Sequence, residues 1–459
     1  MNVLLTGATG LVGKAVGKEL VRQGHRVFVV SRDKDRAILD LPFPAHIIEG
    51  DLALEPLRDD RLLEVDSVIH LAGENIARRR WSSKQKRKIY DSRVKSSQNL
   101  LEALTENKNL RTFISASAVG FYGDRGDEVL TESSSRGHGF LSEVCQDWEQ
   151  SLQLAQRKSR RAGFRPVILR FGLVLSPLGG ALERMLMAVR LGLGGKIGQG
   201  RQWMSWIHID DLVSLILMAL TDPEVHGVIN AVAPEAVTNS EFMKATATVF
   251  GKKLGPPVPR LFLKMALGEM SQLLLYSQRV QSEATAPLNF TFRFAQLRMA
   301  LEDIFARGSG ADEFFFSEQY LPYASEKIFP FFSEARNLER IIPRSMNFKV
   351  TKMSSNEIQR GTLITYRLKV RGIPIHWVTE ISDWQPPQEF TDLQLKGPYS
   401  SWSHRHRFEA MSSGTLMTDV VRFRVPLGVL GRWVAAIWIR RELQSIFQFR
   451  REVVAEIRF

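Results

Sequence analysis

The sequence is poor in cysteine and has no long apolar run. Cys145 is the only cysteine among 459 residues, so no internal disulfide can form, which suits a reducing compartment. No uninterrupted apolar stretch approaches the roughly 18 residues that a membrane-spanning helix needs. The first residues do not have the pattern of a secretory signal segment. We therefore expect a cytoplasmic protein without a membrane span.

No nucleic-acid-binding motif accompanies the basic charge of the chain. Lys and Arg number 62 against 49 Asp and Glu, a net charge of +13 that is spread along the sequence. The densest basic cluster, RRRWSSKQKRK at residues 78–88, opens a helical stretch. We interpret it as a solvated helix face, with an anionic-ligand contact as the alternative. The expected partner is a small-molecule substrate and not nucleic acid; the oligomeric state stays open.

Short apolar runs alternate with helical patterns over residues 1–235. Strands are expected at NVLLT, RVFVVS, HIIEG, SVIHLA, RTFISAS and PVILRFG. This alternation predicts an α/β domain with a doubly wound parallel sheet. Residues 236–306 are predicted to be a helical extension of that domain, and residues 307–311 a linker. Residues 312–459 show successive strands followed by a long amphipathic helix from about residue 429, which predicts an α+β domain.

A glycine-rich turn follows the first strand directly and opens a helix. In TGATGLVG, Gly7 allows a tight turn, Gly10 lets backbone approach a pyrophosphate, and Gly13 permits close helix–strand packing. The pyrophosphate would then bind free N–H groups at the start of the helix. We therefore predict dinucleotide binding. The cofactor-binding residues expected in this turn are Thr6, Gly7, Gly10, Leu11, Val12 and Gly13.

The end of the second strand bears on the choice between NADP and NAD. Ser31 and Arg32 occupy its tip, and a guanidinium matches the geometry of a 2′-phosphate. We predict NADP, with NAD as the alternative. A solvated loop in which Ser31 or Asp33 caps the next helix also stays open. After the third strand, Asp51 would accept a bond from adenine or cap a helix, and Leu52 beside it is a further predicted cofactor contact.

Four motifs give residues 1–305 a family resemblance. TGATGLVG, GDL at 50–52, HLAGE at 70–74 and SASAVGFYG at 115–123 occur in the order found in extended short-chain dehydrogenases/reductases, which have a Rossmann-like fold. GGKIGQGRQWMSWIHIDDLV and INAVAPEAVTNSEF resemble the nucleoside-diphosphate-sugar epimerase-like subgroup, typically NADP-binding with substrates that are generally unknown. The resemblance implies cofactor contacts at Leu71, Ala72, Gly73 and Ser115.

This sequence departs from that family at two catalytic positions. The family uses a serine, a tyrosine and a lysine, and Ser117 matches the serine. Glu149 matches a family glutamate four residues beyond the lysine, so Cys145 takes the place of the lysine and Leu141 that of the tyrosine. The usual proton donor is therefore missing, and standard hydride-transfer chemistry is in doubt.

Other side chains are candidates for the lost role. Tyr122 follows Ser117 closely, and we interpret it as a catalytic acid or, alternatively, a packing residue. Glu132 and His208 are weaker candidates, since we favour a cap or surface role for Glu132 and a structural role for His208. Cys145 as a nucleophile has no basic neighbour in sequence to activate it. Two further residues have their own interpretations. Asp210 is expected to cap the helix that follows it, and Arg170 to contact the cofactor or pair with a structural carboxylate.

The last domain has a resemblance of its own. GPYSSWSHRHRFE, the strand pattern and the final helix resemble the START/polyketide-cyclase-like helix-grip fold, in which a curved sheet and a helix enclose an apolar cavity. This implies an apolar small-molecule ligand. His404 and His406 share a strand face, but without a third ligand in view we predict no metal. Candidate cavity-wall residues are Trp377 and Trp402, and the residues expected to pack the last helix on the sheet are Val434, Ile437, Leu443 and Phe447.

Two hypotheses follow for the whole chain. The first is an NADP(H)-dependent epimerase-like oxidoreductase of unknown substrate with a divergent proton donor, fused to an apolar ligand-binding domain. The second is a non-catalytic NADP(H)-responsive binding or sensor protein, since Leu141 and Cys145 replace the usual tyrosine and lysine.

Overall fold

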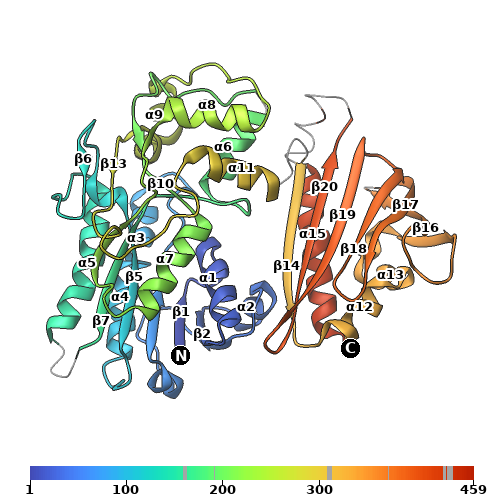
Figure 1. Ribbon diagram of the computed structural model, residues 1–459, viewed down its shortest axis with the longest axis horizontal. Coiled ribbons are helices and arrows are strands. Elements are labelled where there is room, and N and C mark those ends of the chain that lie inside the picture. The colour runs from blue at the N-terminus through green and yellow to red at the C-terminus, as the bar shows by residue number, and fades with distance from the viewer. Residues whose placement is uncertain (159–162, 191, 308–312, 371, 427–430, 432–437) are drawn as a thin grey trace. The chain divides into compact units, whose positions relative to one another are not determined.

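The computed structural model describes residues 1–158, 163–190, 192–307, 313–370, 372–426, 431 and 438–459 (Figure 1). The chain divides into two compact units, one of residues 1–37 and 45–306, the other of residues 38–44 and 307–459. Most of the predicted linker 307–311 lies outside the described residues. Within the described ranges, no helix combines the length and apolarity needed to cross a membrane. The cytoplasmic location stays a prediction.

The first unit is built on a seven-stranded parallel sheet with the order β11-β7-β5-β4-β1-β2-β3. The chain runs outward from β1 in both directions, so the doubly wound prediction is confirmed. The six predicted strands are present, and β11 joins the edge as a seventh that the sequence did not reveal. The strands are β1 (Asn2–Thr6), β2 (Arg26–Ser31), β3 (His46–Glu49), β4 (Ser67–His70), β5 (Thr112–Ala118), β7 (Arg165–Phe171) and β11 (Gly227–Ala231).

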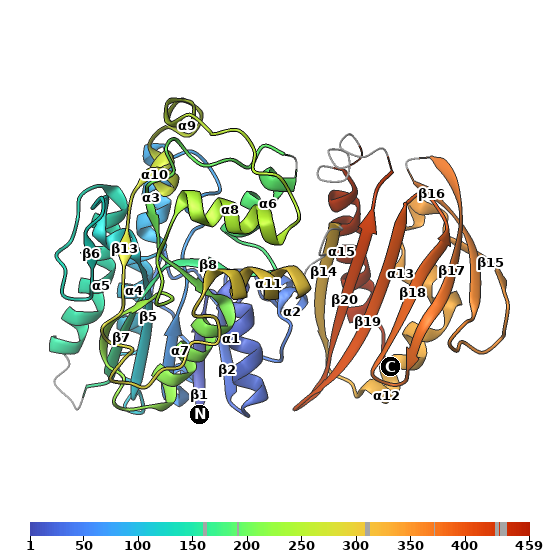
Figure 2. The same cartoon turned by 45° about the horizontal axis from the view of Figure 1, so that its top comes forward.

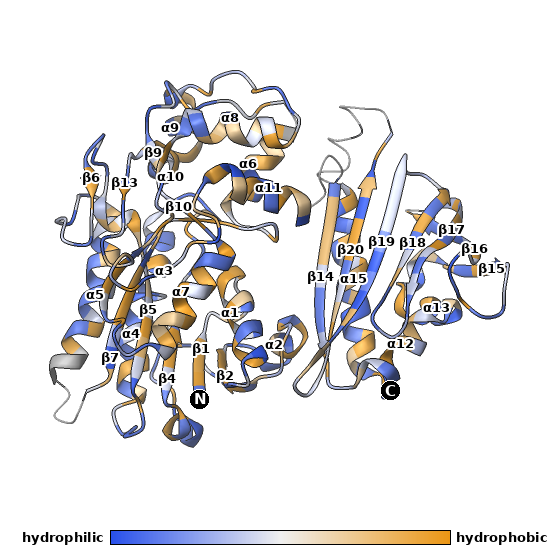
Figure 3. Cartoon of the chain, in the orientation of Figure 1, coloured by the Kyte–Doolittle hydropathy of each residue, from blue (hydrophilic) through white to orange (hydrophobic). Residues whose placement is uncertain are grey.

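Helices cover both faces of this sheet. One face carries α4 packed against α5, and the other α1 packed against α7 (Figure 1). The central strands are buried on both sides, as the fully buried Leu4, Ile69 and Ile114 show, and Figure 3 colours them as apolar. The helices are α1 (Leu11–Arg22), α2 (Lys34–Asp40), α3 (Ser83–Asp91), α4 (Val94–Ala103), α5 (Phe140–Lys158), α6 (Ala181–Arg190) and α7 (Ile209–Thr221).

Residues 236–306 form the helical extension expected from the sequence. Its helices lie beyond the carboxyl ends of the parallel strands (Figures 1 and 2), the edge at which doubly wound folds bind ligands. Trp206, Phe242 and Leu301 share one buried cluster that fixes the extension to the sheet domain. The elements are α8 (Asn239–Val249), α9 (Arg260–Leu267), η3 (Gly268–Ser271), α10 (Gln272–Leu275) and α11 (Leu297–Arg307).

The second unit is an antiparallel seven-stranded sheet with one long helix, so the α+β prediction is confirmed. Its order is β14-β20-β19-β18-β17-β16-β15. Leu443 and Phe447 of α15 (Arg440–Glu456) pack on Val421 and Phe423 of β20 as predicted, while Val434 and Ile437 lie outside the described residues. The strands are β14 (Glu313–Leu321), β15 (Lys349–Met353), β16 (Leu363–Val370), β17 (Ile373–Gln385), β18 (Glu389–Lys396), β19 (Ser401–Met411) and β20 (Gly414–Arg424). The sequence did not reveal β14, β15, α12 (Ser325–Ser333) or α13 (Leu338–Ile341).

Candidate functional site

The glycine turn has the geometry expected of a pyrophosphate cradle. Gly7 has φ +69°, and a Cβ there would lie 2.6 Å from the carbonyl oxygen of Leu71. A Cβ on Gly13 would lie 2.2 Å from the oxygen of Gly7, so the turn closes onto the helix only with glycine at both positions. Gly10 caps α1 without any side-chain bond to the first N–H groups. The N–H groups of Leu11 and Val12 therefore remain available for an anion.

A hydroxyl–imidazole pair ties the turn to the neighbouring strand β4. Thr6 Oγ1 accepts hydrogen bonds from the N–H groups of Leu71 and Ala72, each at 3.2 Å, and lies 2.7 Å from His70 Nδ1. Burial lowers the pKa of His70 to about 3, so the ring is neutral. Its other nitrogen lies 3.3 Å from Ser96 Oγ. The predicted contacts Thr6, Gly7, Leu71 and Ala72 thus come together at one point.

The tip of β2 is followed by the guanidinium of Arg32. Arg32 is exposed, and in the described part of the chain it has no hydrogen-bond or ion-pair partner. Ser31 Oγ donates to the carbonyl of Asp33, whose carboxylate accepts from the N–H of Arg36, so Asp33 caps α2. Asp51 Oδ1 accepts from the N–H of Ala53 at 3.0 Å within a turn, so Asp51 caps no helix and this contact occupies one of its two oxygens. Arg32 is therefore placed to meet a phosphate beyond the strand end.

The polar residues at the ends of β5 and β7 form a closed buried network. Ser117 Oγ donates to Glu149 Oε1 at 2.6 Å. Arg170 donates to both Glu149 oxygens, at 2.9 and 2.8 Å, and to the Tyr122 hydroxyl at 2.8 Å. The Tyr122 hydroxyl in turn lies 2.8 Å from Asn230 Oδ1. All five side chains are buried.

This network changes how three predicted site residues are understood. Burial raises the pKa of Tyr122, whose hydroxyl has three protein partners. That arrangement favours packing and positioning over proton donation. Ser117 likewise donates its hydroxyl hydrogen to Glu149, and its role in lining the active site stays a prediction. For Arg170, the structure shows the pair with a structural carboxylate, and the cofactor contact stays a prediction.

The position of the family lysine holds an inert thiol beside a buried cation. Burial and the Glu149 carboxylate raise the pKa of Cys145 to about 11, which makes a nucleophilic thiolate unfavourable. The guanidinium of Arg93 is buried over the Trp148 ring at 5.5 Å, and a Cβ on Gly73 would lie 3.0 Å from it. The positive charge of Arg93 acts in the opposite direction and lowers the pKa of Cys145, but by less than burial raises it. No sequence motif marks Arg93, because it reaches this site from the junction of α3 and α4.

The remaining acid candidates have structural roles. Glu132 accepts from the Asn230 N–H and the Ser282 hydroxyl. His208 is fully buried and caps α7 by accepting from the Asp210 N–H at 3.2 Å. The prediction that Asp210 caps this helix is therefore wrong: the buried imidazole lies two residues earlier, at the N-cap, and accepts from the free N–H. Ser115 is buried within β5 and donates to the next carbonyl.

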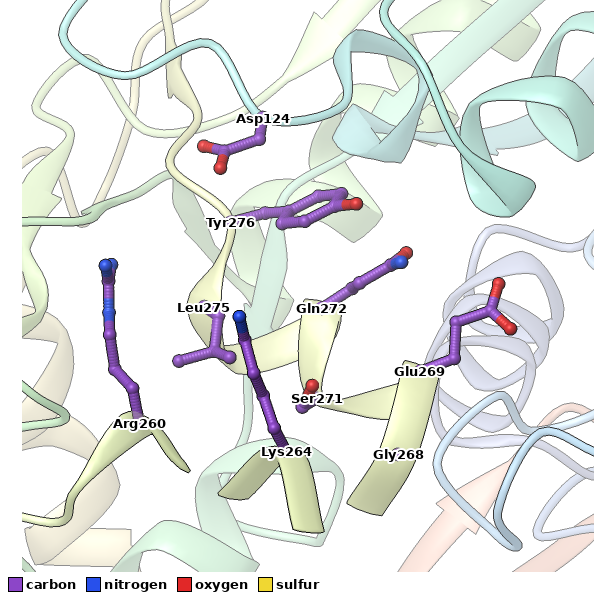
Figure 4. Close-up of a pocket in the computed structure, with 9 residues that line it drawn as sticks. All are labelled: Asp124, Arg260, Lys264, Gly268, Glu269, Ser271, Gln272, Leu275 and Tyr276. Carbon is purple, nitrogen blue, oxygen red and sulfur yellow. The ribbon is translucent and has the colours of Figure 1, made fainter. Parts of the chain in front are cut away.

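A polar pocket of about 430 Å³ lies beside the start of α5 (Figure 4). Arg260 and Lys264, one turn apart on α9, extend into it in parallel, and Asp124 and Tyr276 line the opposite side. A Cβ on Gly139, the residue before α5, would lie 3.6 Å from the Tyr276 hydroxyl. The pocket therefore borders the helix that carries Leu141 and Cys145. The sequence analysis missed it, because the lining residues come from separate segments without a motif.

Part of the basic cluster at residues 78–88 supports this pocket. Arg80 Nε donates to the carbonyl of Ala266 at 2.7 Å, and Lys86 pairs with Glu269. Glu269 lines the pocket. These two cations thus bind protein groups next to the pocket, whereas Arg87 and Lys88 stay exposed, as expected of a solvated helix face.

The second unit encloses an apolar cavity of about 310 Å³ between its sheet and α15. Trp377 and Trp402, predicted as cavity-wall residues, both line it with their rings 5.2 Å apart. His404 and His406 also line it, together with Asp392. The cavity is therefore apolar along most of its wall and polar at one place.

Comparison with known proteins accounts for the first unit. Residues 3–231 match the NAD dependent epimerase/dehydratase family, and residues 258–304 match a domain of unknown function. The chain is 36% identical over 304 residues to the epimerase family protein Mb2239 of Mycobacterium bovis, covering 96% of that protein and 65% of this chain. It is 34% identical over 309 residues to epimerase family protein YfhF of Bacillus subtilis, covering 98% of that protein and 67% of this chain.

A solved structure matches the same region. Human epimerase family protein SDR39U1, crystallised with NADPH, superposes with a TM-score of 0.59 at 32% identity, covering 99% of that chain and 66% of this one. UDP-glucuronic acid 4-epimerase of Bacillus cereus superposes with a TM-score of 0.55 at 20% identity, which shows a shared fold.

Proposed function

We propose that this chain, which belongs to the NAD dependent epimerase/dehydratase family, binds NADP(H) in its first unit and transfers hydride between the nicotinamide and a small-molecule substrate. The observation that carries the proposal is the open glycine turn. Its N–H groups at Leu11 and Val12 have no side-chain cap, and the turn fits only glycine at Gly7 and Gly13. Such a turn after a first parallel strand is suited to a pyrophosphate.

The preference for NADP(H) over NAD(H) rests on Arg32. This guanidinium is exposed at the tip of β2, where the ribose of the adenosine half lies in doubly wound folds. A guanidinium offers paired donors to a phosphate, whereas it gains little from a 2′-hydroxyl. The NADPH bound to the human relative supports the same preference.

The polar pocket beside α5 is our candidate substrate site. It opens at the carboxyl edge of the parallel sheet. Arg260 and Lys264, which have no ion-pair partner within the described ranges, suit an anionic group on the substrate. Burial, Asp124 and Glu269 raise the pKa of Tyr276, so its hydroxyl stays protonated at neutral pH and can donate a hydrogen bond. Arg93 would supply the positive charge that the family lysine normally places beside the nicotinamide ribose. A cofactor site without turnover remains the competing function, and the closed Ser117–Glu149 network is the observation that favours it.

For the second unit we propose a START/polyketide-cyclase-like domain that holds an apolar small molecule. A sheet packed on a long carboxyl-terminal helix around an apolar cavity supports this. Tethering in one chain would keep such a ligand at about millimolar effective concentration near the first unit. Displacement of a bound apolar dye by candidate ligands tests the cavity directly.

Calorimetric titration with NADPH and with NADH tests the cofactor proposal. Arg32→Gln should weaken NADPH binding by about 10- to 100-fold, the value of a hydrogen bond to a charged group, and leave NADH binding unchanged. Arg111→Gln is the matched control, because Arg111 is exposed at the opposite, amino-terminal end of β5. Failure of the wild-type chain to bind either nucleotide would sink the proposal. Binding without turnover across carbonyl and sugar-nucleotide substrates would leave the competing function.

A further inference from the structure

In the second unit, strand register brings four ionisable side chains together. Asp392 on β18 lies directly opposite His404 on β19, and His406 lies directly opposite Asp419 on β20. His404 and His406 are two residues apart and so share one face of the sheet. Asp392, His404 and His406 all line the cavity. Two neighbouring strands, β18 and β19, therefore hold these three groups at the cavity wall, and β20 holds Asp419 next to the two histidines.

The distances within this cluster suit a metal ion. His404 Nδ1 lies 3.7 Å from Asp392 Oδ2, and His406 Nε2 lies 3.5 Å from the same oxygen. One donor atom from each of the three residues falls within 4.8 Å of the other two. Ligand atoms held about 2.0–2.2 Å from a tetrahedral ion are roughly 3.3–3.6 Å apart. Only a small movement of the three side chains toward one another would bring their donor atoms to these distances.

The far sides of both imidazoles meet a second carboxylate. His404 Nε2 is hydrogen-bonded to Asp419 Oδ1 at 3.0 Å. His406 Nδ1 lies 2.7 Å from the same oxygen, at an angle that makes it an ion-pair contact and not a hydrogen bond. With protons on these far nitrogens, the near nitrogens present lone pairs toward Asp392. An outer carboxylate that orients metal-binding histidines in this way is a regular feature of metal sites.

The surroundings hold this arrangement rigidly. Arg450 Nη1 of α15 lies 3.2 Å from Asp419 Oδ1 and pairs with that carboxylate. The His406 ring stacks on Phe390 with centroids 4.3 Å apart, and the His404 ring lies 5.7 Å from that of Phe447. Both imidazoles and the Asp392 carboxylate line the cavity, and on the cavity side the described residues add no further His, Cys, Asp or Glu donor to this cluster.

We propose that Asp392, His404 and His406 bind a divalent first-row transition ion, of the class of Fe(II) or Zn(II), with its remaining coordination positions open to the apolar cavity. Two imidazoles and one carboxylate are the donor set such ions take when they keep positions free for a ligand. The ligand that completes the site is a mainly apolar molecule with one oxygen donor. The third ligand was hidden in the sequence, because Asp392 lies on another strand. This proposal does not depend on NADP(H) binding.

Titration of the chelator-treated full chain tests it. Zn(II) followed by calorimetry should bind with one equivalent, and Co(II) should give a visible absorption band that Zn(II) removes. His404→Gln and Asp392→Asn should each weaken binding by more than about 100-fold, beyond the loss caused by removing an outer partner. His376→Gln is the matched control, because His376 is exposed on the neighbouring strand β17. It should bind as the wild-type chain does.

Two results would overturn the proposal. One is a wild-type chain that takes up neither ion stoichiometrically at micromolar concentration, which would make the cluster a salt-bridge network only. The other is equal loss of affinity in His376→Gln, which would make binding nonspecific. Circular dichroism checks that each variant is folded. If both ligand variants misfold, the position of the Co(II) absorption band in the wild-type chain still decides, because this position differs between an ion bound by imidazoles and one that is not. Analysis of the metal retained after purification separates Fe(II) from Zn(II).

Discussion

The Glu149 cluster of the first unit and the Asp419 cluster of the second are both buried and polar, and they differ in how their groups are satisfied. In the first unit, Glu149 accepts from Ser117 and takes both arms of the Arg170 guanidinium. In the second, Asp419 is shared by His404, His406 and Arg450, while Asp392 faces the near side of both imidazoles at 3.5 Å or more. The first cluster is complete within the protein. The second leaves donor atoms toward a cavity.

The comparison teaches that buried ionisable groups indicate function only when their bonding is incomplete. A carboxylate paired with a guanidinium and a hydroxyl fixes strands and helix, and has no capacity left for a ligand. Imidazoles that are oriented from behind, with only a carboxylate 3.5 Å or more away in front, keep that capacity. Ser117, which the family resemblance singles out as catalytic, belongs to the first cluster, and His404 and His406, which no sequence motif marks as ligands, belong to the second.

The largest expected effect comes from breaking the closed cluster. Glu149→Gln keeps the shape of the side chain but leaves the buried Arg170 without its counter-charge. We expect the free energy of unfolding of the first unit to fall by about 3–5 kcal/mol, the cost of removing one member of a buried pair. Urea denaturation measures it.

Glu143→Gln provides the control for this change, because Glu143 is exposed on the first turn of the same helix. Its loss should stay below about 1 kcal/mol, the value of a carboxylate near a helix start. Equal effects of the two substitutions would show that the Glu149–Arg170 ion pair does not stabilise the first unit as we describe.

A smaller effect is expected from the thiol beside the same cluster. The pKa of Cys145 is about 11 in the fold against an ordinary value of 9. The folded chain therefore keeps a proton that the unfolded chain loses above pH 9, so stability is full below pH 9 and falls as the pH rises toward 11. The loss should reach roughly 2 kcal/mol by pH 10.5, at 1.36 kcal/mol per pKa unit.

Cys145→Ala isolates this contribution. The variant should lose about 2 kcal/mol less than the wild-type chain between pH 8 and pH 10.5 in paired urea titrations. In addition, the folded wild-type chain should not react with a thiol reagent at pH 8, whereas the unfolded chain should react at once. Rapid modification of the folded chain would contradict the inert environment of Cys145 and reopen the nucleophile hypothesis.

Local pattern sufficed to predict the parallel sheet and the glycine turn. The six strands are apolar β-branched runs, and the turn needs glycine for reasons confined to a few residues, as the φ of Gly7 shows. The edge strand β11 escaped because Gly227–Ala231 is short and lies among turn residues. The N-cap of α7 was assigned to Asp210, although the imidazole of His208 makes the contact.

The candidate site could not be predicted to the same degree, because its chemistry depends on contacts between distant segments. Whether Ser117 faces a ligand depends on Glu149, and whether His404 has a third donor beside it depends on the register of β18. Spacing along one strand shows which side chains share a face but not which side chains of the next strand oppose them. Arg93 likewise reaches the site from the junction of α3 and α4, and no local pattern in the sequence marks it.

The smallest expected effect separates ligation from distortion of the sheet. Arg405 lies between His404 and His406 on β19, so its side chain points to the other face, where it donates to both oxygens of Glu389 at 2.8 and 2.6 Å. It is exposed, and an exposed pair contributes about 0.2–1 kcal/mol to stability. Arg405→Gln should therefore lower the free energy of unfolding of the second unit by no more than this amount and leave Zn(II) affinity unchanged. If it weakened Zn(II) binding as much as His404→Gln, any change in β19 would disturb the cluster, and the open face we assign to the two imidazoles would lose its meaning.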